Sequence, residues 1–528
     1  MAKFRLFLKN TLLLTLTSLL MRTAGVYFNL YLTDRLGADG MGLFTLTGTV
    51  YGLAIILATS AVTLASTRLV SEAMGVARGD AHHDSAKESG QILAAMGQCI
   101  GYSLFFGTLA GGLLFILAIP LGKSVLGDGR TIPSLRLLAI SLPFQALTSA
   151  LSGYFTAVRR VSKNALTMIF EQALRIGATV LLLTYCTSGG LEEACLWVVA
   201  GGVLGNLFSF LYCLFLYLRD LRKFHRGQKA DPAERSPMRK KLLAIALPVA
   251  FSSYLRQGLV TLEHLLIPWG LKKQGNSQTA ALSTYGLMQG MSLPIIMFPY
   301  AFLSPFCNLL VPEIAEKRAA QDARGVEQIT LRVFRFVLAM GIGTAGIFLC
   351  LSHELGTVIC GSADAAKYIG LLAPLVPIMY LDTAVDSILK GLNEQLFCMR
   401  VNLLDSALSV MIVLFLLPKW GIYGYIAEIF ACELINASLS VMRLMDVLKI
   451  RLSPWMAIRP LLAIFAATTL ARFIFALTLP FATDGWVLSA HIVIIALLYA
   501  GFMALPFLQG LCPCTLPRTL LKKGSWHS

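Results

Sequence analysis

Residues 7–32 read FLKNTLLLTLTSLLMRTAGVYFNLYL and form the first long apolar run of the chain. A helix of about 20 apolar residues crosses the hydrocarbon core of a bilayer, so this run is long enough to span it. Arg22 lies near its middle, and Arg256 has the matching place in the run at 242–270, 256 − 22 = 234 positions later. Charge in hydrocarbon is costly and is usually retained for function. The two arginines therefore predict a duplicated transporter with a cavity that attracts anions.

The composition is that of a membrane protein. The 528 residues are 56% hydrophobic and only 14% charged, whereas soluble domains are about 25% charged. Continuously apolar runs favour helices over the alternating strands of a barrel. The sequence predicts an all-α integral membrane protein with about 14 transmembrane helices. The runs lie near 7–32, 41–66, 90–120, 133–157, 164–186, 195–218, 242–270, 281–310, 330–351, 367–390, 397–417, 422–442, 455–479 and 486–508.

The net charge of +16 is distributed unevenly along the chain. With the N-terminus placed in the cytoplasm, cytoplasmic segments hold about 32 Lys and Arg residues and the opposite side about 7. This asymmetry predicts a multi-pass protein of the plasma membrane with both termini in the cytoplasm. No soluble domain carries the basic residues, so membrane lipids and not nucleic acid are the expected partners of this charge.

An internal repeat indicates two homologous halves. Leu137–Pro143 reads LLAISLP and Leu371–Pro377 reads LLAPLVP, again 371 − 137 = 234 positions apart. Halves with an even number of helices share one orientation, with a cavity between them. The predicted domains are an N-terminal six-helix lobe over 1–218, a basic cytoplasmic linker over 219–241, a C-terminal six-helix lobe over 242–446, two additional transmembrane helices within 447–510 and a basic cytoplasmic tail over 511–528.

Three arginines are the candidate substrate ligands. Arg22 is too deep in its span to reach the interface easily, and a guanidinium binds a diphosphate with two parallel hydrogen bonds. The alternative is a buried ion pair that holds helices together. Arg256 repeats this placement in the second half. Arg68 lies where the second span leaves the membrane, four residues before Glu72 on one helical face, as expected either for an interfacial ion pair or for guiding an anionic head group inward.

Acidic residues within the spans are candidates for ion coupling or for structural ion pairs. Glu171 and Arg175 are four residues apart, a spacing that keeps charge neutral inside a membrane. Glu263 follows Arg256 on a compatible face. Asp382 and Asp386 repel each other on one helix face, so at least one needs a proton, a cation or a basic partner. Further charged residues in the runs show no pattern that distinguishes them: Asp405, Glu428, Glu433 and Arg472.

The sequence does not indicate an enzyme. No Walker motif is present, and no arrangement of serine, histidine and acid or set of metal ligands stands out. The eleven cysteines are scattered, mostly within apolar runs, where a thiol acts as a small hydrophobe. We expect no catalytic residue, no bound metal and no cofactor.

Four motifs resemble a known family in their order and spacing. They are LGADGMGLF at Leu36–Phe44, RLVSEA at Arg68–Ala73, GYFTAVR at Gly153–Arg159 and EQALRI at Glu171–Ile176. Over about residues 5–450 the chain resembles the oligosaccharide flippases of the multidrug/oligosaccharidyl-lipid/polysaccharide (MOP) exporter superfamily, which also contains the MATE-like multidrug transporters. It looks most like the stage V sporulation protein B group, which is similar to the lipid II flippases of peptidoglycan synthesis.

The resemblance implies a bacterial two-lobed transporter of lipid-linked sugars that serves the making of cell wall or spore cortex. In lipid II flippases, arginines of the first and eighth helices face the cavity. Arg22 matches the first of these, whereas Arg256 falls in the seventh predicted helix. Cell-wall synthesis enzymes are further expected partners.

The sequence thus predicts a flippase that moves an undecaprenyl-pyrophosphate-linked saccharide from the cytoplasmic to the outer leaflet by alternating access. Two alternatives stay open. One is a multidrug or organic-cation antiporter of the same superfamily, although the first helix has no embedded acid before Asp34. The other is a non-transporting scaffold for wall synthesis.

Overall fold

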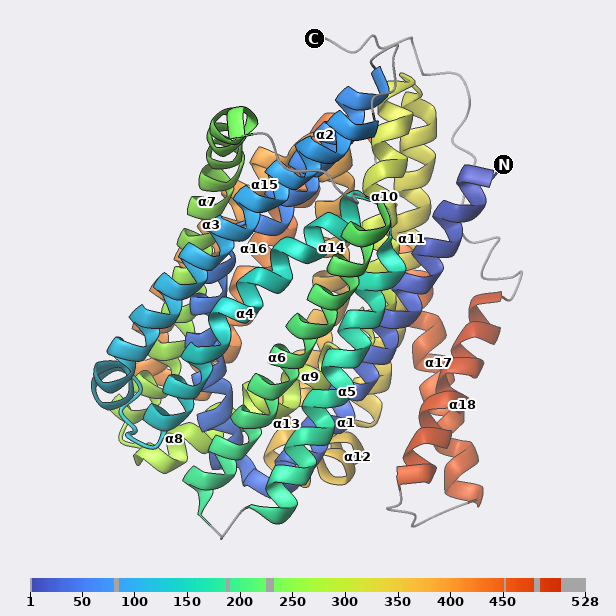
Figure 1. The fold of residues 1–528 in the computed structure, drawn as a ribbon. Helices are drawn as coiled ribbons and strands as arrows, with labels where there is room; N and C mark the ends of the chain where they lie inside the picture. The colour runs from blue at the N-terminus through green and yellow to red at the C-terminus, as the bar shows by residue number, and fades with distance from the viewer. Residues whose placement is uncertain are drawn as a thin grey trace. The chain divides into compact units, whose positions relative to one another are not determined.

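The structure is a computed structural model that describes residues 2–79, 85–158, 160–186, 190–224, 232–450, 453–478 and 485–504. All secondary-structure elements of these residues are helical (Figure 1). The prediction of an all-α membrane protein is confirmed.

The described α-helices begin and end as follows: α1 (Ala2–Thr59), α2 (Val62–Gly79), α3 (Ser85–Pro120), α4 (Thr131–Ala157), α5 (Val161–Tyr185), α6 (Leu191–Phe224), α7 (Pro232–Lys273), α8 (Gln278–Tyr285), α9 (Leu293–Ile296), α10 (Tyr300–Ala319), α11 (Ala323–Cys350), α12 (Ser352–Glu354), α13 (Ala363–Leu372), α14 (Val376–Gly391), α15 (Gln395–Trp420), α16 (Ile422–Leu448), α17 (Trp455–Thr478) and α18 (Gly485–Ala504). Short π-helical or 3₁₀ turns join some of them: η1 (Leu121–Val125), η2 (Gly286–Ser292), η3 (Leu355–Ile359) and η4 (Ala373–Leu375).

The number of spans agrees approximately with the prediction. Twelve described helical stretches are long and apolar enough to cross a membrane, and a thirteenth arises if Gln278–Ile296 and Tyr300–Ala319, bent by 54°, form one span. The stretch Thr23–Glu72 counts once, although Gly37 breaks α1 with φ 67° and ψ −178°. At about 1.5 Å per residue, α1 is far longer than a 30 Å hydrocarbon core. The predicted count of 14 is therefore approximate.

A second break separates α1 from α2. Ser60 and Ala61 both have left-handed backbone conformations, with φ 44° and 59°, which side chains with a Cβ adopt at a cost. The Tyr102 hydroxyl donates to the Ser60 carbonyl at 3.2 Å, and the Tyr254 hydroxyl contacts the Ser60 hydroxyl. These contacts hold the chain at this corner.

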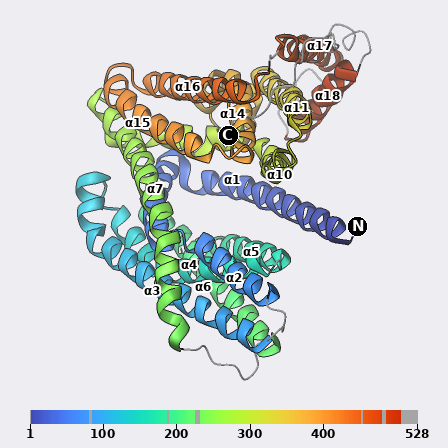
Figure 2. The ribbon, with the colours of Figure 1, turned by 90° about the horizontal axis from the view of Figure 1, so that it is seen from above.

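The helices form two compact units. Unit one contains Met1–Pro305 and Met399–Cys432, and unit two contains Phe306–Cys398 and Glu433–Ser528. In unit one, α4 packs against α2, α3 and α6, and α5 packs against α6 (Figure 2). Buried aromatic side chains fill the space between these helices: Tyr154, Phe155 and Tyr217. This packing holds the helices that carry the site.

In unit two, α11 packs against α14 and α17, and α17 packs against α18 (Figure 2). The Tyr499 hydroxyl of α18 donates to the Ala339 carbonyl of α11 at 2.7 Å. Helices α17 and α18 lie within the range predicted for two additional spans. The described parts of the predicted linker continue α6 and α7, and its residues 225–231, like the tail 511–528, lie outside the described residues. The lobe boundaries stay predictions.

Candidate functional site

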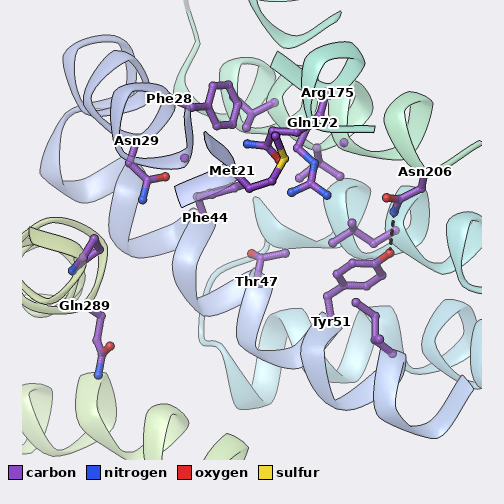
Figure 3. Close-up of a pocket in the computed structure, with 18 of the residues that line it drawn as sticks. Met21, Phe28, Asn29, Phe44, Thr47, Tyr51, Gln172, Arg175, Asn206 and Gln289 are labelled. Carbon is purple, nitrogen blue, oxygen red and sulfur yellow. Dashed lines mark hydrogen bonds between the residues drawn. The ribbon is translucent and has the colours of Figure 1, made fainter. Parts of the chain in front are cut away.

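A cavity of about 730 Å³ lies within unit one. Figure 3 shows side chains of α1, α5 and α6 around it, together with Gln289 of η2. Its lining is mostly apolar, with polar side chains between the apolar ones, as in many small-molecule sites. The polar side chains are Asn29, Thr47, Tyr51, Gln145, Gln172, Arg175, Asn206 and Gln289.

The spacing of these residues follows the helix period. On α1, Phe44, Thr47, Gly48, Tyr51 and Ile55 recur at intervals of three or four, so they share one face. The same spacing holds before Gly37 and on α6. Several helices therefore line the cavity, each with one face that carries polar residues.

Arg175 is the only charged residue among the described residues that line this cavity. Its guanidinium donates to Glu171 Oε1 at 2.9 Å, and Ser209 donates to Glu171 Oε2 at 3.0 Å. The Arg175 Nε is buried and has no hydrogen-bond partner within the described part of the chain. Gly205 of α6 permits the close approach, because a Cβ there would lie 3.1 Å from the Arg175 Cβ. Glu171 thus holds the Arg175 guanidinium in place through Nη2, and the Nε–H group has no acceptor among the described residues.

A neutral hydrogen-bond chain lies beside the arginine. The Tyr51 hydroxyl is 2.6 Å from the Ser141 hydroxyl and accepts from Asn206 Nδ2 at 3.1 Å. The Gln145 Oε1 is buried, and no described group donates to it. This wall offers hydroxyl and amide groups to a polar, uncharged part of a ligand.

Two smaller cavities adjoin the first through shared lining residues. One, of about 350 Å³, contains Glu171, Ser149 and Ser152. The other, of about 410 Å³, contains Gln257 and His264 of α7. The first shares Met21, Gln145 and Gln172 with the 730 Å³ cavity, and the second shares Asn29, Phe44, Gly48, Gln289 and Pro294. Polar groups therefore continue through three neighbouring spaces of unit one.

A group of carboxyl side chains, Glu263, Asp405 and Glu428, forms a second polar feature of unit one. Glu263 and Glu428 both lie next to Ser409 and interact with each other and with Asp405. Glu428 is 3% exposed, and its Oε2 has no hydrogen-bond partner among the described residues. We name these three acids the carboxyl cluster. Within the described ranges, no three His, Cys, Asp or Glu residues are placed to hold a metal ion together.

The predicted arginines have different surroundings. Arg22 lies in α1, but its side chain is outside the part of the chain that the structure describes; its neighbours Met21 and Gly25 line the cavity. Arg256 is exposed on α7, lies near Asp405 and is not among the described lining residues of the three cavities. Their roles as substrate ligands stay predictions.

The remaining predicted residues have polar partners at the surface or within unit two. Arg68 contacts Glu72 at 3.1 Å, and both side chains are exposed. Asp386 pairs with Lys390 at 3.0 Å, whereas Asp382 accepts from Asn436 at 3.4 Å. The two aspartates thus have different partners, and their part in ion coupling stays a prediction.

Sequence reasoning did not identify the neutral residues of the site. Tyr51, Asn206, Gln145 and Asn29 are uncharged and do not stand out in apolar runs. The one feature of the sequence that could have identified them is their spacing from other polar residues, which places them on the same helix face. Asp405 and Glu428 were noted only as charged residues without a pattern.

Comparison with solved structures defines the class of fold. The structure matches lipid II flippase MurJ in an inward closed conformation over 95% of this chain and 99% of that chain, with a TM-score of 0.68 and 13% identity. It matches an inward-facing multidrug resistance MATE family transporter of the MOP superfamily over 82% of this chain and 99% of that chain, with a TM-score of 0.62 and 11% identity. The fold is MurJ- and MATE-like.

Sequence comparison then gives the family. The chain belongs to the polysaccharide biosynthesis protein family, whose model matches residues 7–301. It is 26% identical to stage V sporulation protein B of Bacillus subtilis (strain 168) over 424 residues, 79% of each chain. It is 23% identical to sporulation protein YkvU of the same organism over 412 residues, 77% of this chain and 88% of the relative. The resemblance predicted from the four motifs is confirmed.

Proposed function

We propose that this protein is a flippase that moves an undecaprenyl-pyrophosphate-linked saccharide from the cytoplasmic to the outer leaflet of the bacterial plasma membrane. The observation that carries the proposal is Arg175, a half-buried guanidinium that is the one charged side chain in the described lining of the 730 Å³ cavity. The fold supports the proposal, since a lipid II flippase has a similar structure.

The chemistry of the cavity suits a diphosphate attached to a sugar. A guanidinium binds phosphate oxygens through planar, charge-assisted hydrogen bonds. Glu171 accepts a hydrogen bond from Nη2 of Arg175, and the exposed part of the guanidinium is the part that a phosphate oxygen would meet. Arg22 would add a second cation from the neighbouring turn of Met21 and Gly25. The polyprenyl chain would stay in lipid because moving so long an apolar chain out of hydrocarbon into a water-accessible cavity would be unfavourable.

Transport by alternating access requires the cavity to open to one side at a time. Both termini in the cytoplasm, as the charge asymmetry predicts, would fix which side of the membrane each opening of the cavity faces, and the energy source would set the direction of net transport. The membrane potential could supply energy at about 2.3 kcal/mol per charge moved through 100 mV. The carboxyl cluster is the proposed site of coupling to a proton, because three acids in a buried setting cannot all hold a charge cheaply.

A multidrug or organic-cation antiporter is the second candidate function. The carboxyl cluster favours it, since buried acids attract cations and a MATE family transporter has a similar fold. In this case, cationic dyes would be expelled in exchange for protons and Arg175 would not be required.

The experiment uses the full chain in proteoliposomes that contain fluorescent undecaprenyl-pyrophosphate disaccharide. Arg175→Gln is expected to slow its translocation at least about tenfold, with Arg175→Lys intermediate, because lysine lacks the planar pair of donors. Arg22→Ala and Arg22→Lys test the second cation. Arg332→Gln, an exposed change on α11, is the matched control. Unchanged translocation by Arg175→Gln, or extrusion of cationic dyes by the parent, would reject the flippase.

A further inference from the structure

The 410 Å³ cavity differs from its neighbours in its charge. Its described lining contains amides, hydroxyls and one imidazole but no aspartate, glutamate, lysine or arginine. The cavity lies between α1 and α7 and reaches the turn η2. Its volume falls within the range of small-molecule sites, about 300–1,000 Å³.

Two side-chain amides in this cavity are available to a ligand. Asn29 and Gln257 line it, and neither makes a hydrogen bond to any group of the described chain. Gly52 leaves room for the Gln257 amide, because a Cβ at Gly52 would lie 3.8 Å from Gln257 Nε2. A side-chain amide can donate and accept at once, which matches the paired donor and acceptor character of sugar hydroxyls.

The other polar groups of the wall are already oriented. His264 Nδ1 is 2.9 Å from the Tyr285 hydroxyl, and Gln289 Nε2 donates to the Tyr425 hydroxyl. Gln289 also lines the 730 Å³ cavity that contains Arg175. A ligand that spans the shared wall would therefore have a cationic region at one end and a neutral amide region at the other.

We infer that the 410 Å³ cavity is a separate subsite for an uncharged saccharide ring of the lipid-linked substrate. The inference rests on the proposed flippase function and adds a specificity to it. The diphosphate takes the cavity of Arg175, and Asn29 and Gln257 bind the hydroxyls of the sugar. A uronic acid at this place would bury its carboxylate without a cation, which is unfavourable. The subsite therefore selects neutral sugars.

The test measures equilibrium binding to the detergent-solubilised full chain with three probes. These are undecaprenyl pyrophosphate alone, the same lipid with an N-acetylhexosamine, and the same lipid with a hexuronic acid. The parent is expected to bind the hexosamine lipid more tightly than the bare lipid, and the hexuronate lipid no more tightly than the bare lipid. Gln257→Leu should weaken hexosamine binding about three- to tenfold and leave bare-lipid binding unchanged. Asn29→Leu should weaken hexosamine binding as well, but Asn29 also lines the 730 Å³ cavity, so only Gln257 separates the two sites.

One further variant should change the preference of the subsite from a neutral to an acidic sugar. Gln257→Lys should increase affinity for the hexuronate lipid, because it places a cation beside the carboxylate. Gln328→Leu, an exposed amide on α11, is the matched control for loss of an amide. Unchanged bare-lipid binding in the Gln257 variants and in Gln328→Leu shows that the protein is folded.

The outcomes separate this inference from the proposed function. If the bare lipid binds and Arg175→Gln abolishes that binding, but both sugars bind like the bare lipid, the subsite is refuted and the flippase stands. Equal weakening of all three probes by Gln257→Leu also refutes the subsite. If the parent binds none of the lipids, the proposed function fails and the subsite fails with it.

Discussion

Gly42 of α1 and Gly286 of η2 face each other at a crossing that no side chain could enter. A Cβ on Gly42 would lie 2.0 Å from the Leu282 carbonyl oxygen, and a Cβ on Gly286 would lie 2.2 Å from the Ala38 carbonyl oxygen. The two backbones therefore touch, as small residues allow in membrane helices. This contact joins α1 to η2 beside the cavities, so the alternating access proposed above would have to change it.

Alanine at this crossing should shift the conformational equilibrium. Gly42→Ala forces α1 and η2 apart, and overpacking of this kind costs about 1–3 kcal/mol. We expect a longer distance between spin labels at Asp34 and Thr279, measured by electron–electron double resonance. Gly97→Ala, whose Cβ would meet nothing within 4 Å, is the control. An unchanged distance distribution in Gly42→Ala would show that the crossing tolerates a methyl group.

Glu171 should weaken anion binding by competing for Arg175. Glu171→Gln removes the negative charge at 2.9 Å from the guanidinium, so affinity for undecaprenyl pyrophosphate should rise about fivefold, the equivalent of about 1 kcal/mol. Isothermal titration in detergent measures this change. A fall in affinity would mean that the carboxylate positions Arg175 and does not compete with the ligand.

Asp220 should be a strong determinant of stability. It is 3% exposed and contacts Arg160 Nη1 and Lys163 Nζ, each at 2.5 Å. Asp220→Ala leaves both cations without this partner and should cost about 3 kcal/mol of unfolding free energy. Asp364→Ala breaks the exposed pair with Lys367 and should cost less than about 1 kcal/mol. Steric-trapping measurements of both variants check the contrast, and equal losses would contradict it.

The carboxyl cluster should couple transport to protons. Glu428→Gln keeps the shape of the side chain and removes its proton exchange. We expect translocation to lose its stimulation by an imposed pH gradient, while binding of the lipid in detergent stays unchanged. A gradient response equal to that of the parent would leave the cluster with a structural role only.

The start of α11 should depend on pH through Asp322. Hydrogen bonds from Lys317 Nζ at 3.0 Å and from the Gly325 amide at 2.9 Å hold the pKa of Asp322 below its usual value. A lowered pKa in the folded state adds stability above the unfolded pKa, about 4, and this stability is lost as the pH falls through the folded pKa.

The expected readout is faster hydrogen exchange in the first turn of α11 at low pH, after correction for intrinsic rates. Asp322→Asn keeps a side chain that can cap the helix but has no titrating group, so its protection should not change over this range. A parent profile as flat as that of the asparagine variant would contradict the assignment.

Much of the fold was predictable because hydrocarbon imposes a simple rule on the sequence. Membrane spans must be long and apolar, so the apolar runs in the sequence were enough to predict them. The break at Gly37 was not predictable in this way, because it depends on a local backbone conformation. The Glu171–Arg175 pair was also predictable, since residues four apart share a helix face. The partners of Tyr51 were not, because Ser141 and Asn206 lie 90 and 155 positions away.

The repeat alone does not determine where the Arg256 side chain points, and its role as a substrate ligand stays a prediction. An offset of 234 places it at the depth of Arg22, but one residue of helix turns a side chain by about 100°. If the offset between the halves changes by a few positions, a residue keeps its approximate depth in the membrane, but its side chain points to a different side of the helix. The structure has Arg256 exposed near Asp405, a relationship that depends on the packing of α7 against α15.

Ten of the 22 described residues that line the 730 Å³ cavity belong to α1, between Met21 and Ile55 on both sides of Gly37. Nearly half of the described lining of the proposed substrate cavity is thus encoded by one short, contiguous piece of the gene. Exchanging that piece between family members should therefore transfer substrate preference from one protein to the other in a single cloning step. Scattered substitutions across the other helices would be needed only to refine the result.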